Sequence, residues 1–134
     1  MWTAGLLPTE ERTMLAVGVD IIELERVAGT LERFAGRFLS RIYTPQEQAY
    51  CRGRIPQLAA RFAAKEAVAK ALGIGINNGL SFSAINIHHT THGKPRVDIQ
   101  FPTSLQNKYA DLDISLSISD EQEYAVAFAL AASL

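Results

Sequence analysis

The chain has 134 residues, of which 48% are hydrophobic and 20% charged, and its net charge at pH 7 is −1. This is the composition of one globular domain that buries about two-thirds of its unfolded surface, and it excludes a disordered chain. A net charge so close to zero argues against a nucleic-acid protein that binds through bulk charge.

Residues 1–13 show no clear hydrophobic period and contain Gly5 and Pro8, so we interpret them as an N-terminal extension. Residues 14–134 are expected to form the single domain, with Met14 as a candidate natural start. A lone cysteine, Cys51, indicates a reducing cytoplasmic compartment. No apolar run has the length of a membrane span, and charged residues near the N-terminus argue against secretion.

The first half of the domain is predicted to be one strand followed by helices. Alternating apolar residues indicate a strand over 15–20, and Asp20 ends it on the face of Ala16 and Gly18. Amphipathic stretches over 22–34 and 37–42 indicate helices. Residues 44–47 read Thr-Pro-Gln-Glu, an N-cap with a capping-box glutamate, and begin a helix that runs to about residue 52.

The strongest helical pattern covers residues 57–72, where seven of sixteen residues are alanine, and Gly73 is expected as its C-cap. A helix with so little side-chain bulk can lie close to a sheet. The remaining chain is rich in strand patterns, at 81–88, 96–101, 112–118 and 124–130, with a short helix over 104–110. The last strand is apolar throughout and is expected to be buried on both faces. The order predicts an α+β fold.

Phe62, Glu66 and Lys70 are spaced four residues apart and share one stripe of the long helix. Taken alone, Glu66 and Lys70 read as an ordinary surface pair. If the helix crosses the first strand, however, Glu66 can meet Asp20. Two carboxylates with the lysines Lys65 and Lys70 nearby suit a Mg²⁺ ion whose other ligands are substrate phosphates.

Three further patterns carry weaker signals. The glycine loop over 73–79 leaves a helix, so it is not a dinucleotide fingerprint, although it would let a ligand approach the backbone. His88, His89 and His92 lie around a turn and read as solvated rather than metal-binding. The arginines over 26–41, interleaved with Phe34 and Phe38, form either a solvated face or a docking surface for an acidic helix.

Three sequence elements together resemble the bacterial holo-acyl-carrier-protein synthases, the small 4'-phosphopantetheinyl transferases. They are G-V-D-I-I-E at 18–23, R-F-A-A-K-E-A-V-A-K-A-L-G-I-G at 61–75 and G-K-P at 93–95. The resemblance covers nearly everything from Met14 onward, and the long K-E-A helix is its most specific part. It implies an antiparallel sheet packed against that helix.

The resemblance also implies an activity. Coenzyme A would donate 4'-phosphopantetheine to a serine of apo-acyl carrier protein, with Mg²⁺ as cofactor and a homotrimer as the assembly, in fatty acid biosynthesis. Asp20 and Glu66 would be the metal ligands, with Lys70 as a further catalytic residue. Contacts to coenzyme A would come from Lys65, Lys70, Gly73, Lys94 and Pro95. Carrier-protein docking would involve Arg26, Arg37, Phe38, Arg41, Arg61 and Phe62.

One position departs from the pattern that the resemblance predicts. Many members have Ser-His before the last strand, where this chain has Ser119-Asp120. Asp120 is expected either near the nucleotide, turned from its phosphates, or in a solvated turn. The serine proton would pass to Glu66 or to a metal-bound water. The alternative function is a non-catalytic trimeric module that binds a nucleotide or carrier protein.

Overall fold

The computed structural model describes residues 14–76 and 78–133. The expected extension over residues 1–13 lies outside the described residues. The elements follow in the order β1 (Met14–Glu23), α1 (Leu24–Ile42), α2 (Pro45–Cys51), α3 (Ile55–Leu72), the 3₁₀ turn η2 (Phe82–Ala84), β2 (Ile85–His89), β3 (Pro95–Ile99), α4 (Thr103–Gln106), β4 (Leu112–Asp120) and β5 (Tyr124–Ser133). Within these residues, no helix is both long and apolar enough to cross a membrane.

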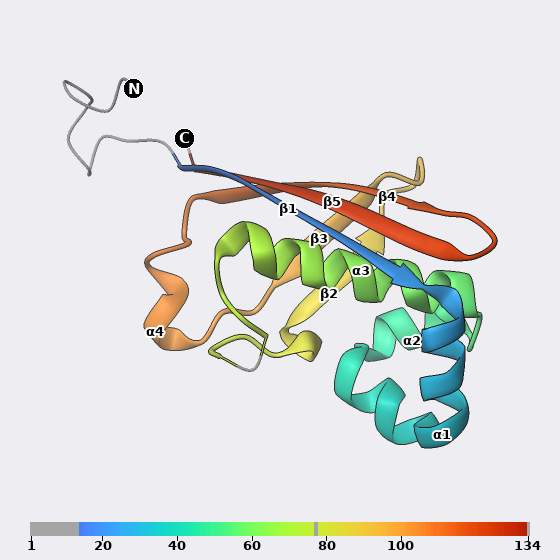
Figure 1. Cartoon of the computed structure of the whole chain (residues 1–134). Helices are drawn as coiled ribbons and strands as arrows, with labels where there is room; N and C mark the ends of the chain where they lie inside the picture. Colours follow the sequence, from blue (N-terminus) through green and yellow to red (C-terminus); the bar gives the residue numbers. More distant parts are fainter. Residues whose placement is uncertain (1–13, 77, 134) are drawn as a thin grey trace.

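The strands form two antiparallel sheets that share one long helix. Strand β5 lies between β1 and β4, while β2 pairs with β3. Helix α3 runs across one side of both sheets, and α1 and α2 gather at its N-terminal end (Figure 1). This architecture confirms the predicted α+β fold with an antiparallel sheet against a long helix.

Alanine and glycine bring α3 unusually close to the three-stranded sheet. Ala63, Ala64 and Ala67 of the helix are fully buried, as are Ala127 and Ala129 of β5. At Gly18 of β1, a Cβ atom would lie 2.0 Å from the carbonyl oxygen of Ala67. Since no side chain can occupy that space, Gly18 lets the strand and the helix touch through their backbones.

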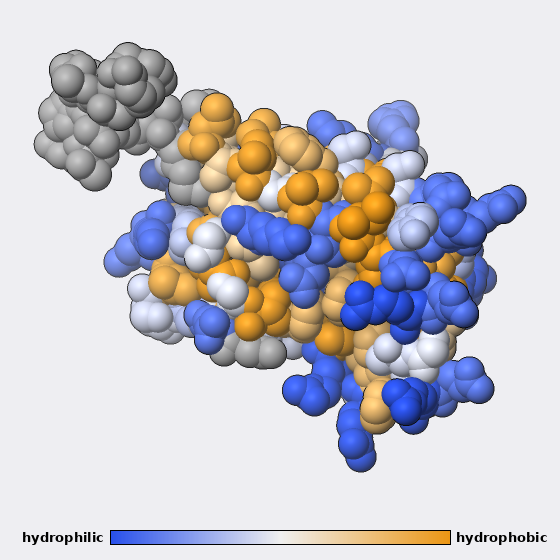
Figure 2. Space-filling view, viewed as in Figure 1, coloured by the Kyte–Doolittle hydropathy of each residue, from blue (hydrophilic) through white to orange (hydrophobic). Residues whose placement is uncertain are grey.

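The outer face of the same sheet corrects the expectation that β5 is buried on both sides. The alanines of β5 face α3, but the alternate side chains Val126 and Phe128 are 37% and 45% exposed. Next to them, the outward residues of β1 are also exposed, namely Leu15, Val17, Val19 and Ile21. Figure 2 shows the resulting hydrophobic band along β1. One copy of the chain does not cover this face.

Several element boundaries differ from their predictions. Strand β1 continues through Ile22 to Glu23, so Asp20 lies within the strand and not at its end. Helix α1 covers both helices predicted over 22–34 and 37–42, and the gap expected between them is a kink at Ala35, which has φ 37°. The segment before Ile85 forms η2, so β2 is shorter than expected. The Thr44–Glu47 capping box and the left-handed Gly73 C-cap are confirmed.

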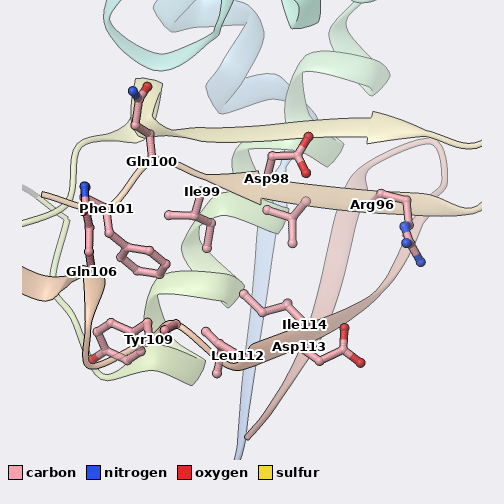
Figure 3. Close-up of a pocket in the computed structure, with 12 residues that line it drawn as sticks. Arg96, Asp98, Ile99, Gln100, Phe101, Gln106, Tyr109, Leu112, Asp113 and Ile114 are labelled. Atoms are coloured by element: carbon pink, nitrogen blue, oxygen red, sulfur yellow. The ribbon is translucent and has the colours of Figure 1, made fainter. Parts of the chain in front are cut away.

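Strands β3 and β4 lie side by side without forming a common sheet. A hollow lies between them, and Figure 3 shows Ile99, Leu112 and Ile114 pointing into the space that separates the two strands. Phe101 and Tyr109 stack at one end with their ring centroids 4.9 Å apart. None of the residues predicted for the active site lines this hollow.

Candidate active site

Asp20 and Glu66 meet in one pocket, as the sequence predicts. The pocket has a volume of about 450 Å³ and also contains Arg26, Phe38, Phe62 and Lys70. Asp20 reaches it from the face of β1 that lies against α3, because Gly18 two residues earlier fits directly against the helix. Glu66 and Lys70, one helical turn apart, reach it from α3.

Lys70 pairs with Asp20 and not with Glu66. Its Nζ atom lies 3.0 Å from Oδ1 of Asp20 and donates a second hydrogen bond of 3.0 Å to the carbonyl oxygen of Val19. The Lys70 side chain is nevertheless 53% exposed. An ordinary surface pair within α3 is therefore not the arrangement formed, and Lys70 presents its charge at the pocket.

Glu66 lacks an ion-pair partner among residues 14–76 and 78–133. Burial, and secondarily the charge of Asp20, raise the pKa of Glu66, while Lys70 lowers it in part. A cation between two such carboxylates would relieve both effects, and oxygen ligands are those that Mg²⁺ prefers. The donor set thus fits a Mg²⁺ ion with few protein ligands.

In the described part of the chain, no group of three or more His, Cys, Asp or Glu residues is placed to hold a metal ion. Nε2 of His88 lies 2.8 Å from a carboxylate oxygen of Asp98. Nδ1 of His89 lies 2.9 Å from Nη2 of Arg61. The side chains of His88 and His89 are half-buried on β2, so they are not the solvated turn residues that the sequence indicates, whereas His92 is exposed in the turn before β3.

A second hollow adjoins the carboxylate pocket along α1. Arg37, Phe38 and Arg41 line it from the helix, and Ser81–Ser83 line it from the opposite side. Phe38 and Thr30 belong to both hollows, so the two form one continuous groove. Arg26 borders the carboxylate end, and the three arginines are exposed. The predicted docking residues of α1 are thus brought together beside Asp20 and Glu66.

Contrary to the prediction, Lys65 is not available to a ligand. The residue is fully buried, and its Nζ atom lies 2.6 Å from Oε1 of Glu47. It also donates hydrogen bonds to the carbonyl oxygens of Ile42, Phe82 and Ile85, at 2.7, 2.9 and 2.7 Å. Burial lowers the pKa of Lys65, and the Glu47 carboxylate opposes that shift. The expected contact with coenzyme A is wrong in this structure.

Arg61 is a second correction. It is only 3% exposed, and its guanidinium group lies 4.0 Å from the ring centroid of Tyr50. Because arginine can only donate, Nδ1 of His89 accepts its hydrogen bond. Arg61 therefore packs inside the protein and offers no docking surface. Phe62 does line the carboxylate pocket, where it stacks on Phe82.

The remaining predicted residues lie outside the pocket. Gly73 is exposed at the end of α3, and Lys94 is exposed in the turn that leads into Pro95 and β3. Asp120 is exposed at the end of β4. Within one chain they do not meet Asp20 and Glu66, so their contacts with coenzyme A stay predictions.

Sequence reasoning did not single out two residues of the groove, Thr30 and Phe82. Thr30 lies four residues after Arg26 and eight before Phe38, so helical spacing alone places it on the same stripe and was a usable signal. Phe82 follows the glycine loop, and its position opposite α1 arises from tertiary packing that no local pattern encodes.

Comparison with known proteins identifies the family of the chain. Residues 16–129 match the family model described as the 4'-phosphopantetheinyl transferase superfamily. The holo-[acyl-carrier-protein] synthase of Protochlamydia amoebophila is 44% identical over 119 residues, covering 87% of this chain and 96% of the relative. That of Dehalococcoides mccartyi is 42% identical, covering 88% and 98%.

Solved structures show the same fold. The Helicobacter pylori holo-[acyl-carrier-protein] synthase in complex with coenzyme A aligns with a TM-score of 0.79 at 30% identity, covering 86% of this chain and 98% of that one. The Neisseria meningitidis enzyme aligns with a TM-score of 0.74 at 38% identity, covering 87% and 96%. The chain therefore belongs to the 4'-phosphopantetheinyl transferase superfamily, as one of its holo-[acyl-carrier-protein] synthases.

Proposed function

We propose that the chain transfers 4'-phosphopantetheine from coenzyme A to a serine of apo-acyl carrier protein, and so supplies fatty acid biosynthesis in the cytoplasm. The serine oxygen forms a bond to the phosphorus next to the pantetheine. The bond from that phosphorus to the leaving nucleotide breaks, and adenosine 3',5'-bisphosphate departs. The observation that carries the proposal is the pocket in which Asp20, Glu66 and Lys70 meet beside an arginine-lined groove.

Asp20 and Glu66 would hold a Mg²⁺ ion, which neutralises charge on the pyrophosphate when it is bound. Phosphoryl transfer depends mainly on charge neutralisation and in-line positioning, so a reactive nucleophile on the enzyme is not needed. Lys70 supplies a further positive charge at the pocket. Its side chain is 53% exposed, so its ammonium group can contact a phosphate oxygen of the substrate.

The serine hydroxyl must lose a proton during transfer. Glu66 lines the pocket, so either its carboxylate or a metal-bound water would accept this proton. Phe38 and Phe62 line the same pocket with apolar surface, which limits the access of competing water. This apolar lining favours transfer to the carrier serine over hydrolysis.

Arg26, Arg37 and Arg41 would receive an acidic helix of the carrier protein, with Phe38 between them as the apolar contact. The groove they line runs directly into the carboxylate pocket, so a serine at the end of a docked helix would arrive beside Asp20 and Glu66. Charge complementarity of this kind chiefly accelerates association and is screened by salt.

A homotrimer would cover the exposed outer face of the β1-β5-β4 sheet. Four β1 side chains on this face, from Leu15 to Ile21, are between 55% and 74% exposed, and Phe128 of β5 adds to the band. Such a contiguous apolar surface is unusual on a monomer and suits contacts between copies. Light scattering at micromolar concentration should give three times the chain mass, and a monomer mass would refute this assembly.

The function is tested by incubating the chain with an apo-acyl carrier protein, coenzyme A and Mg²⁺. Mass spectrometry should show the carrier gaining one phosphopantetheine, and chelation of the metal should prevent it. A carrier in which the acceptor serine is replaced by alanine is the matched control. Binding of coenzyme A or carrier without any mass gain would instead support the non-catalytic module.

A further inference from the structure

The buried ion pair between Lys65 and Glu47 is a costly feature that the proposed chemistry does not use. Removing two charges from water carries a large desolvation cost, and replacing such a pair with apolar residues is often neutral or stabilising. Lys65 is fully buried, and four oxygen atoms of the protein contact its ammonium group. Because such an ion pair by itself adds little stability, the role of Lys65 lies in the groups that it connects.

The partners of Lys65 belong to two parts of the chain that are distant in sequence from α3 and from each other, residues 42–47 and residues 82–85. The carbonyl of Ile42 lies at the C-terminal end of α1, those of Phe82 and Ile85 belong to η2 and the start of β2, and Glu47 belongs to α2. Glu47 itself accepts hydrogen bonds from the backbone N–H groups of Thr44 and Ile87. One ammonium group on α3 thus holds both parts of the chain against the helix.

These two parts of the chain contribute to the opposite walls of the arginine-lined groove. Ile42 lines it from α1, on the same helix as Arg37 and Arg41, and Phe82 lines it from η2. Phe38, at the centre of the groove, packs edge-on against Tyr43, whose ring centroid is 5.7 Å from Nζ of Lys65. Lys65 lies beneath the groove and holds both walls.

Helix α3 also carries Glu66, the residue that follows Lys65, into the carboxylate pocket. The ammonium group therefore fixes the groove relative to the same helical turn that places Glu66. We propose that Lys65 is a positioning residue for the carrier substrate: it holds the two walls of the groove at a fixed separation and a fixed distance from the metal carboxylates. This inference rests on the proposed function, because the groove is a docking site only if the chain modifies a carrier protein.

The test uses the double variant Glu47→Gln/Lys65→Met, which keeps the side-chain lengths and leaves no unpaired buried charge. The KM for apo-carrier protein should rise by about tenfold, since small misplacements of a bound substrate cost up to about 100-fold. The dissociation constant of coenzyme A, measured by calorimetry in Mg²⁺, should stay close to that of the wild type. An unchanged KM for the carrier would overturn the proposal.

Val68→Ala is the matched control, because Val68 is a fully buried residue of α3 that lines neither hollow. It weakens the core without touching the clamp, so its KM for the carrier should match that of the wild type. The same rise in this control would show that the effect is a general loss of stability and would overturn the positioning role.

Hydrogen exchange tests the clamp independently of turnover. Amides over residues 36–43 and 81–86 should exchange faster in the double variant, while those of β1 keep their wild-type rates. Unchanged exchange in the two groove walls would overturn the clamp even if kinetics had changed. A wild-type chain that modifies no carrier would refute the proposed function, and the exchange measurement would then decide on the clamp alone.

Discussion

Lys65 and Glu66 are neighbours on α3, yet their surroundings are opposite. Lys65 is fully buried, and a carboxylate and three carbonyl oxygens surround its ammonium group. Glu66 is half-buried beside a second carboxylate, and its pKa is raised. The first charge is satisfied by the fold and holds it together. The second is left for something outside the chain to neutralise, which is characteristic of a functional site.

The largest expected effect comes from removing the two carboxylates of the pocket. Asp20→Asn and Glu66→Gln should each lower kcat by about 100- to 1,000-fold, the usual cost of losing one electrostatic contact to a transition state. Because neither carboxylate holds the fold together, circular dichroism and the assembly mass should stay unchanged. Near-normal activity of either variant would remove the two-carboxylate metal site.

Removing the buried charge of Lys65, which the fold satisfies, should lower the stability of the protein. Lys65→Met alone leaves Glu47 buried without its cation and should cost about 3–5 kcal/mol of unfolding free energy. The double variant with Glu47→Gln should recover a substantial part of this loss. Denaturant unfolding measures both variants, and equal destabilisation in the two would show that the ion pair is not the source of the effect.

A smaller effect is expected from substituting an arginine of the groove. Arg41→Glu should raise KM for the carrier by about tenfold at low salt, with a smaller ratio at high salt, because exposed charges are screened. Affinity for coenzyme A should not change. Arg33→Glu, exposed on α1 but lining neither hollow, is the matched control. Equal weakening of both substrates would reject a separate carrier surface.

The smallest effect is a pH dependence of stability at Glu66. Folding raises its pKa above the ordinary value of 4.5, so the stability that protonated Glu66 contributes is present at low pH and lost as pH rises through the raised pKa. Glu66→Gln, which mimics the neutral acid, should therefore be more stable than wild type at neutral pH when metal is chelated. The difference in stability between Glu66→Gln and the wild type should vanish as the pH falls to about 4.

Thermal unfolding across this pH range measures the effect. Glu32→Gln, an exposed glutamate of α1 outside the pocket, serves as the control. If Glu66→Gln were less stable than wild type at neutral pH, the carboxylate would be a satisfied group like Glu47, and the contrast between the two neighbours would fail.

Local signals in the sequence predicted much of the fold. The capping box at Thr44 and Glu47, the alanine-rich α3 and its Gly73 cap each depend on short-range chemistry, and the structure confirms them. The end of β1 was misplaced because Ile21 and Ile22 fit both a strand and a helix pattern. The gap between the two helices predicted over 22–34 and 37–42 coincides with the kink at Ala35, whose positive φ interrupts α1.

Helical spacing predicts part of the site. It misses the residues whose orientation depends on partners that are distant in the sequence. Spacing placed Glu66 and Lys70 on one stripe, and Asp20 on the strand face that meets it. Spacing could not show that Lys65 and Arg61 point into the protein, because their partners come from α2 and β2. Likewise, the apolar pattern of β5 indicated burial but not whether the same chain covers both faces.

The contact between Gly18 and Ala67 limits how this site can vary over evolutionary time. Two backbones meet there without side chains, so no change of rotamer can absorb a larger residue. Asp20 lies two residues from that contact and Glu66 lies next to it. Neighbouring side chains can compensate for substitutions elsewhere in the core. The spacing of the two carboxylates, however, is set by the contact between the two main chains. Lineages of this protein should therefore be free to change the groove, and with it the partner, long before they change the pocket.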